Sequence, residues 1–183
     1  TNVVQSEVAV VTGIAIEHVD YLGGTHESIA AEKLAILKPE GVLITGALPP
    51  SVEPMAEARA AEVGTAHRAF GRDFRLESER LAVGGWAFDV DGVYERYDEL
   101  FLPLHGRHQA ANAAVAVAAV EELFGKAIPE EPAREGLAAV GSPGRLEVVD
   151  RDPLVLIDGA HKPQAFEALA ATSDGFVLAE KDL

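Results

Sequence analysis

The stretch "VAVVTGIAIEHVDYLGGTHESIAAEKLAILKP", residues 8–39, decides the fold class. Its first five residues are apolar or β-branched and predict a buried strand. After a glycine-containing loop, Thr25 is a suitable N-cap and Glu27 favours a first helical turn. Apolar residues then recur every three or four positions up to Leu37, and Pro39 with Gly41 is expected to end that helix. A strand followed by a helix is typical of α/β proteins.

The same pattern continues downstream. "VLIT" (42–45) predicts a second buried strand, and an alanine-rich helix is expected to end near Gly64. Between residues 66 and 104 short strands are expected, with Asp91-Gly92 as a two-residue hairpin turn. Residues 106–125 are nearly all strong helix formers and predict a core helix, and a short helix follows Pro129. The sequence therefore predicts a mostly parallel sheet with helices and a small antiparallel part.

"GSPGR" (141–145) is rich in turn residues and is the best candidate for a domain boundary. We expect a first domain over residues 1–140 and the start of a second over 141–183. The second resumes as strands 146–149 and 154–158, a helix over 163–171 and a strand over 175–179. These elements cannot close a core alone. We expect an unfinished sheet, whose exposed edges would permit self-association.

Composition excludes several functions. The net charge is −15 and the basic residues form no cluster, which disfavours nucleic acid as a partner. Cysteine is absent, so disulfides, thiolate metal sites and thiol nucleophiles are excluded. No apolar run reaches the length of a membrane span and no signal peptide is evident. We expect a soluble protein of the cytoplasm.

Single residues point to chemistry only weakly. On spacing alone, His18 is better interpreted as a satisfied loop histidine, and Lys33 as a lysine that extends from a helix edge. His105 and His108 lack a nearby third ligand, which disfavours a metal. The segment Phe124–Ala127 ("FGKA") lacks the first glycine and the hydroxyl of a phosphate loop. "IDGAH" (157–161) is expected at the carboxyl end of a buried strand, where ligand groups gather in open parallel sheets, although Asp158 and His161 could simply make local hydrogen bonds.

Taken in order, several segments resemble one family: "VVTGIAIEHVDYLGGTHESIAAEKLAILK", "LPLHGRHQAANAAVAVAAVEELFG", "SPGRLEVV", "LIDGAHKP" and "FVLAEKDL". They are similar to bifunctional dihydrofolate synthase/folylpolyglutamate synthase enzymes of the Mur ligase superfamily, especially actinobacterial ones. The resemblance implies a Mur-ligase-type central domain followed by the start of a Rossmann-like C-terminal domain. It also implies an ATP-dependent ligase that joins L-glutamate to folate or dihydropteroate through an acyl phosphate, with Mg²⁺ neutralising the phosphate oxygens.

The resemblance also assigns residues. Lys33 matches a lysine that is carbamylated in the family, a modification that requires the neutral amine and is favoured by partial burial. His18 matches a magnesium ligand. Asn112 matches an asparagine near the adenine, and Arg145 matches a linker arginine that reaches the ATP phosphates. Asp158 and His161 match a loop that closes over the nucleotide and substrate.

The chain departs from the family in three ways. Lys162 replaces an asparagine and Glu17 replaces an aspartate. The family's glycine-rich phosphate loop has no counterpart among the 183 residues, so we expect this chain alone to be inactive. Two alternatives stay open: a non-catalytic truncated relative that binds a ligand or partner, and a peptidoglycan-precursor Mur ligase. The sequences of the segments "HGRHQ" and "SPGRLE" favour the folate branch over the peptidoglycan-precursor ligases.

Overall fold

The computed structural model describes residues 3–16 and 24–160, together with residues 166 and 170. The chain forms two compact units. The first unit comprises Thr1–Arg75, Asp91–Glu95 and Ala114–Ile128. The second comprises Leu76–Val90, Arg96–Ala113 and Pro129–Leu183.

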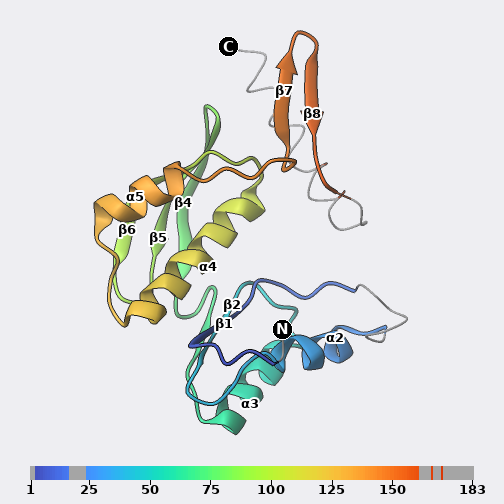
Figure 1. Ribbon diagram of the computed structural model, residues 1–183, viewed down its shortest axis with the longest axis vertical. Helices are drawn as coiled ribbons and strands as arrows, with labels where there is room; N and C mark the ends of the chain where they lie inside the picture. Colours follow the sequence, from blue (N-terminus) through green and yellow to red (C-terminus); the bar gives the residue numbers. More distant parts are fainter. Residues whose placement is uncertain (1–2, 17–23, 161–165, 167–169, 171–183) are drawn as a thin grey trace. The chain divides into compact units, whose positions relative to one another are not determined.

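A parallel sheet is the centre of the first unit. Its strands are β1 (Val8–Val11), β2 (Val42–Thr45) and β3 (His67–Ala69), which lie in chain order. Both pairings are parallel, with Val8 opposite Val42 and Leu43 opposite His67. Helices α2 (His26–Leu34) and α3 (Glu53–Val63) connect the strands and contact each other (Figure 1). The predicted alternation of strands and helices is confirmed.

Helix α2 begins as predicted and ends earlier than predicted. The Thr25 hydroxyl accepts the backbone N–H of Ser28 at 3.2 Å, which satisfies one of the unpaired donors of the first turn. The helix stops at Leu34, and the Leu37 N–H donates to the Leu34 carbonyl in a tighter turn.

The core of the first unit forms where the helices cover the strands. Ile29, Leu37 and Leu43 are completely buried, so Leu37 packs inside even though it lies beyond the helix. The remaining buried members of this cluster are aliphatic: Ala9, Val11, Ile14, Ala30, Leu34, Leu48, Val52, Ala56 and Ala60. This core holds α2 and the end of β1 in place, which positions the first candidate site.

A second sheet contains β4 (Arg75–Ala82), β5 (Gly85–Asp91) and β6 (Arg96–Leu102) in chain order. Only two residues join β4 to β5, so this pair is an antiparallel hairpin. The predicted two-residue turn after β5 is wrong: four residues connect β5 to β6, closed by the Gly92 N–H on the Glu95 carbonyl at 2.9 Å. A buried carboxylate holds the longer turn, which the turn residues alone could not reveal.

Helix α4 (Arg107–Phe124) confirms the predicted helix over 106–125, and its residues belong to both units. Helix α5 (Glu130–Ala138) packs against β6 (Figure 1). Ala133 of α5 is buried, as are the large side chains of the two strands beneath it: Phe88, Val90, Tyr97, Leu100 and Leu102. No helix in the described part of the chain combines the length and apolarity needed to cross a bilayer.

The last described strands, β7 (Glu147–Arg151) and β8 (Leu154–Ile157), pair antiparallel with each other. The expectation of a buried strand at this position is wrong, because Val155 and Ile157 of β8 are 40% and 50% exposed. The predicted helix over 163–171 lies almost entirely outside the described residues, and the predicted strand over 175–179 lies wholly outside them. The boundary expected at residue 141 stays a prediction.

Candidate functional site

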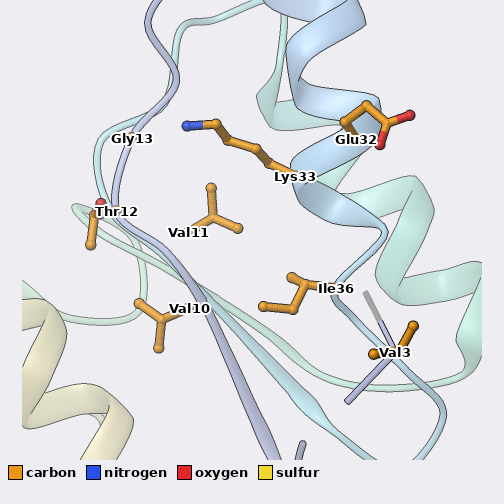
Figure 2. Close-up of a pocket in the computed structure, with 8 residues that line it drawn as sticks. All are labelled: Val3, Val10, Val11, Thr12, Gly13, Glu32, Lys33 and Ile36. Carbon is orange, nitrogen blue, oxygen red and sulfur yellow. The ribbon is translucent and has the colours of Figure 1, made fainter. Parts of the chain in front are cut away.

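A pocket of about 620 Å³ lies at the carboxyl end of β1. Half of its lining residues are aliphatic, and Lys33 of α2 lines it together with Val3, Val10, Val11, Thr12, Gly13, Glu32 and Ile36. Figure 2 shows the Lys33 side chain running from α2 toward the segment around Gly13, whereas the Glu32 side chain turns away. The structure therefore brings an amine to the end of a parallel strand, where ligand groups gather in open sheets.

Lys33 is half-buried, and its position on α2 explains this. Ile29 and Ala30, one turn earlier, are completely buried, so this face of the helix is turned inward. The lysine stem can pack along the aliphatic wall while the amine reaches the edge of the strands. Such a partly enclosed amine is suited to chemistry that an exposed lysine does not support.

Gly46 keeps the edge of the pocket narrow. Its N–H donates to the Val11 carbonyl at 2.9 Å, which continues the pairing of β2 with β1. A Cβ at position 46 would lie 2.1 Å from the Thr12 carbonyl oxygen, so only glycine fits there. The backbone that follows β1 is thereby fixed next to Lys33.

A second group of candidate residues lies in the other unit. The Asp158 carboxylate accepts the N–H of Leu146 at 2.8 Å and the N–H of Ala160 at 2.7 Å. The Gly159 N–H also donates to the Gly144 carbonyl at 2.7 Å. These bonds tie the segment before β7 to the segment after β8. Asp158 therefore makes the local hydrogen bonds that the sequence left open as one interpretation.

Arg145 is exposed and lies in this tied segment, between Gly144 and Leu146, which both have positive φ angles of 72° and 48°. It lines a cavity of about 350 Å³, whose other wall includes Pro103 and His105 from just before α4. Its guanidinium passes Gly159, with Nη1 3.9 Å from the place of a Cβ there. Asn112 is exposed on the first half of α4.

His108 joins this group, a residue that the sequence analysis considered only for a metal. It keeps an exposed face, yet the protein atoms around the rest of its imidazole lower the pKa of His108 by burial. The Asp158 charge acts to raise this pKa and the Arg145 charge acts to lower it further. Asn112 follows His108 by four positions, which places the two residues on one face of α4.

Two predicted site residues, His18 and His161, lie outside the described residues, as do Glu17 and Lys162. Within the described part of the chain, no group of three histidine, aspartate or glutamate side chains is arranged to hold a metal ion. Two described sites contain predicted residues. One is the pocket lined by Lys33, and the other is the Arg145 group, which comprises Arg145, Asp158, His108 and Asn112.

The first unit is an α/β domain with a three-stranded parallel sheet, and Lys33 lines a pocket at the carboxyl end of β1. The Mur ligase middle domain family matches residues 1–120, and the chain belongs to this family.

Among curated proteins, the chain is 39% identical over 182 residues to the dihydrofolate synthase/folylpolyglutamate synthase of Mycobacterium tuberculosis, covering 94% of this chain and 37% of that protein. It is 34% identical over 173 residues to the folylpolyglutamate synthase of Lacticaseibacillus casei, covering 92% of this chain and 40% of that protein. The chain thus spans about two fifths of the length of these relatives.

Solved structures agree with these relatives. The M. tuberculosis folylpolyglutamate synthase complexed with ADP and AMPPCP superposes with a TM-score of 0.89 at 40% identity, covering 93% of this chain and 40% of that one. A complex of a folylpolyglutamate synthase with AMPPCP and folate gives a TM-score of 0.90 at 31% identity, covering 96% and 43%. The mixed α/β fold is therefore that of the central part of these enzymes.

Proposed function

We propose that this chain is the central part of an ATP-dependent ligase that adds L-glutamate to folate or dihydropteroate. The observation that carries the proposal is the 39% identity to a dihydrofolate synthase/folylpolyglutamate synthase over 94% of the chain. A carboxylate is a poor electrophile, so ATP first phosphorylates it and the glutamate amine then displaces the phosphate. Enzymes of this chemistry act mainly by positioning their reactants and neutralising phosphate charge.

The nucleotide is assigned to the Arg145 group. Structures of folylpolyglutamate synthases with ADP and AMPPCP support a nucleotide as the ligand of this fold. Arg145 is permanently charged and planar, which suits it to phosphate oxygens. Asn112 offers both a donor and an acceptor for the edge of an adenine. Asp158 holds the loop that carries Arg145 through the Leu146 N–H.

Lys33 is assigned to the reacting centre. A carbamate on its amine would replace a cation by an anion with two oxygen acceptors, and the half-buried setting in an aliphatic pocket supports this modification. We assign His18 to Mg²⁺ and His161 to the closing loop, on the resemblance alone. When bound, the metal would neutralise phosphate oxygens during transfer.

The remaining assignments follow from the proposed reaction. The partners are small molecules: ATP, L-glutamate, and folate or dihydropteroate, and a folate complex of a similar enzyme supports the last of these. We place the protein in the cytoplasm, which fits a sequence without cysteine. Self-association through the edges of β7 and β8 is a further expectation.

The test is glutamate transfer by the full-length protein that carries these residues. Incubation with ATP, glutamate and either dihydropteroate or a reduced folate is expected to give a product one glutamate heavier by mass spectrometry. Amino-acid addition to a UDP-linked muramic acid, with no addition to folates, would overturn the folate assignment. The 183-residue chain lacks a Walker-type phosphate loop and is expected to form no ADP; glutamate-dependent turnover by it would contradict this part of the account.

A further inference from the structure

Arg145 lies at the centre of a short loop whose backbone N–H groups are held by hydrogen bonds. The N–H of Gly144 donates to Oε2 of Glu147 at 2.8 Å. The N–H of Leu146 donates to Oδ2 of Asp158 at 2.8 Å. The N–H of Arg145 itself donates at 3.2 Å to a carbonyl three residues earlier. Three consecutive N–H groups are therefore fixed, two of them by carboxylates.

This loop is built on the β7–β8 pair. Glu147 is the first residue of β7 and lies opposite Ile157, the last residue of β8. Gly159 follows β8 by two residues, and its N–H donates to the Gly144 carbonyl at 2.7 Å. The backbone that carries Arg145 is therefore an extension of the hairpin, and both of its ends are tied to the two strands.

The backbone has a left-handed conformation on both sides of Arg145. Gly144 and Leu146 have φ angles of 72° and 48°. Leu146 is buried, and its burial together with the bond to Asp158 holds this rare conformation. Gly144 has no side chain that could anchor it in the same way, and a glycine can adopt many other conformations. Its N–H is restrained by Glu147, so loss of that carboxylate would release one of the two bonds that hold the glycine.

The side chain of Arg145 is exposed, in contrast to its restrained backbone. It lines the cavity of about 350 Å³ together with Glu147. A permanent cation on a restrained loop can bind a phosphate without first ordering the chain that carries it, which lowers the cost of binding. The negative charge of Glu147 would itself oppose a phosphate in this cavity, so any benefit from Glu147 must come from its hydrogen bond.

We propose that Glu147 is a positioning residue for Arg145, whose carboxylate restrains Gly144 and thereby keeps the guanidinium in place for the nucleotide phosphates. This proposal rests on the assignment of the nucleotide to the Arg145 group. It adds a residue that acts through Arg145 and makes no contact of its own with the nucleotide.

The experiment is calorimetric titration of the full-length protein with AMPPCP, an ATP analogue that is bound in structures of similar enzymes. Glu147→Ala is expected to weaken AMPPCP binding about tenfold, the factor that corresponds to one net hydrogen bond. Glu147→Gln removes the charge but keeps an oxygen that can accept the Gly144 N–H, so its affinity is expected to stay within about threefold of wild type. Glu135→Ala, at an exposed carboxylate on α5 of the same unit, is the control and is expected to bind as wild type.

A double-mutant cycle separates positioning of Arg145 from a general structural role. Arg145→Ala is expected to bind AMPPCP more weakly than wild type. Because Glu147 acts through Arg145, adding Glu147→Ala to this variant is expected to cause no further loss of affinity. A loss of equal size in the presence and absence of Arg145 would show that Glu147 acts independently of it, and would overturn the proposal.

Two other results would also overturn the role of Glu147. One is wild-type affinity of Glu147→Ala. The other is a loss in Glu147→Gln as large as that in Glu147→Ala, which would assign the effect to charge and not to the hydrogen bond. Unchanged affinity of Arg145→Ala would remove the nucleotide from the Arg145 group, and the inference with it. Glutamate transfer is measured separately, so failure of the ligase assignment is distinguishable from each of these results.

Discussion

The carboxylate of Glu121 accepts the backbone N–H of Val93 at 2.6 Å. It also accepts the N–H groups of Tyr94 and Glu95 at 3.3 and 3.2 Å, so one side chain of α4 holds the whole turn between β5 and β6. Glu121 is completely buried, and a Cβ at Gly92 would lie only 2.7 Å from its Oε2. A buried carboxylate of this kind is stable only when its acceptors are satisfied.

Replacing Glu121 by alanine is therefore expected to destabilise the fold. Three backbone donors, of which the half-buried Val93 N–H makes the shortest bond, would lose their acceptor, and leaving a buried group unsatisfied costs about 1–3 kcal/mol. We expect the free energy of unfolding, measured with urea, to fall by at least about 2 kcal/mol. Glu7→Gln, on an exposed carboxylate, is the matched control. A Glu121→Ala protein within about 0.5 kcal/mol of wild type would show that the turn is held by other contacts.

Gly46→Ala is expected to disturb the edge of the Lys33 pocket. The new methyl group would lie 2.1 Å from the Thr12 carbonyl oxygen, so the ends of β1 and β2 must separate. Overpacking of this kind costs about 1–3 kcal/mol, measurable as a lower midpoint in urea. Gly136→Ala is the matched control, because position 136 is helical and has no atom within 4 Å of a Cβ. That variant should gain about 0.5–1 kcal/mol. Equal effects of both variants would contradict the close approach of the two strands.

The third prediction concerns pH. His67 of β3 hydrogen-bonds through Nε2 to the Thr45 hydroxyl at 2.8 Å, and burial, reinforced by Arg72, lowers the pKa of His67 below its ordinary value. The unfolded chain therefore binds a proton more readily than the folded one, so stability rises with pH. This contribution is present above the unfolded pKa of about 6.5 and is lost as the pH falls toward the folded pKa.

The measurement is the free energy of unfolding in urea at several pH values from about 5 to about 8, a range that brackets the ordinary histidine pKa of about 6.5. His67→Gln is expected to show a shallower loss of stability on acidification than wild type. The charged groups facing His67 are Arg72, Asp73, Glu57 and Glu53, and they are present in both proteins. Parallel pH profiles for the two proteins would mean that His67 keeps an ordinary pKa.

Much of the first unit could be predicted from the sequence because its signals are local. The Thr25 cap, the spacing of four and then three positions from Ala30 to Leu34 to Leu37, and the β-branched runs each act within a few residues. The predictions that were wrong depend on contacts between residues that are far apart in the sequence. Glu121 lies 28 residues from Val93, so no turn signal could give the length of that turn. The antiparallel pairing of β7 with β8 is likewise not encoded in either strand alone.

The site was predictable in part. Lys33 of α2 lines the pocket at the carboxyl end of the parallel strand β1, as the order of strand and helix predicts. Arg145 and Asp158 are brought into one loop system by hydrogen bonds between segments 12 residues apart. The lowered pKa of His108 was missed, because a histidine at the start of a helix reads as a cap or packing residue and the burial that lowers its pKa involves residues distant in the chain. Its signal becomes visible only in three dimensions.

The central claim is that Lys33 serves the glutamate-transfer reaction, and one measurement tests it most directly. In the full-length protein, glutamate addition to dihydropteroate or a reduced folate is followed for wild type, Lys33→Ala and Lys33→Arg, with the exposed Lys126→Ala as control. Wild type and Lys126→Ala are expected to transfer glutamate at similar rates, whereas both Lys33 variants should lose about 100-fold in rate, since neither can carry a carbamate that orients the reacting groups. Glutamate transfer by Lys33→Ala at the wild-type rate would contradict the account.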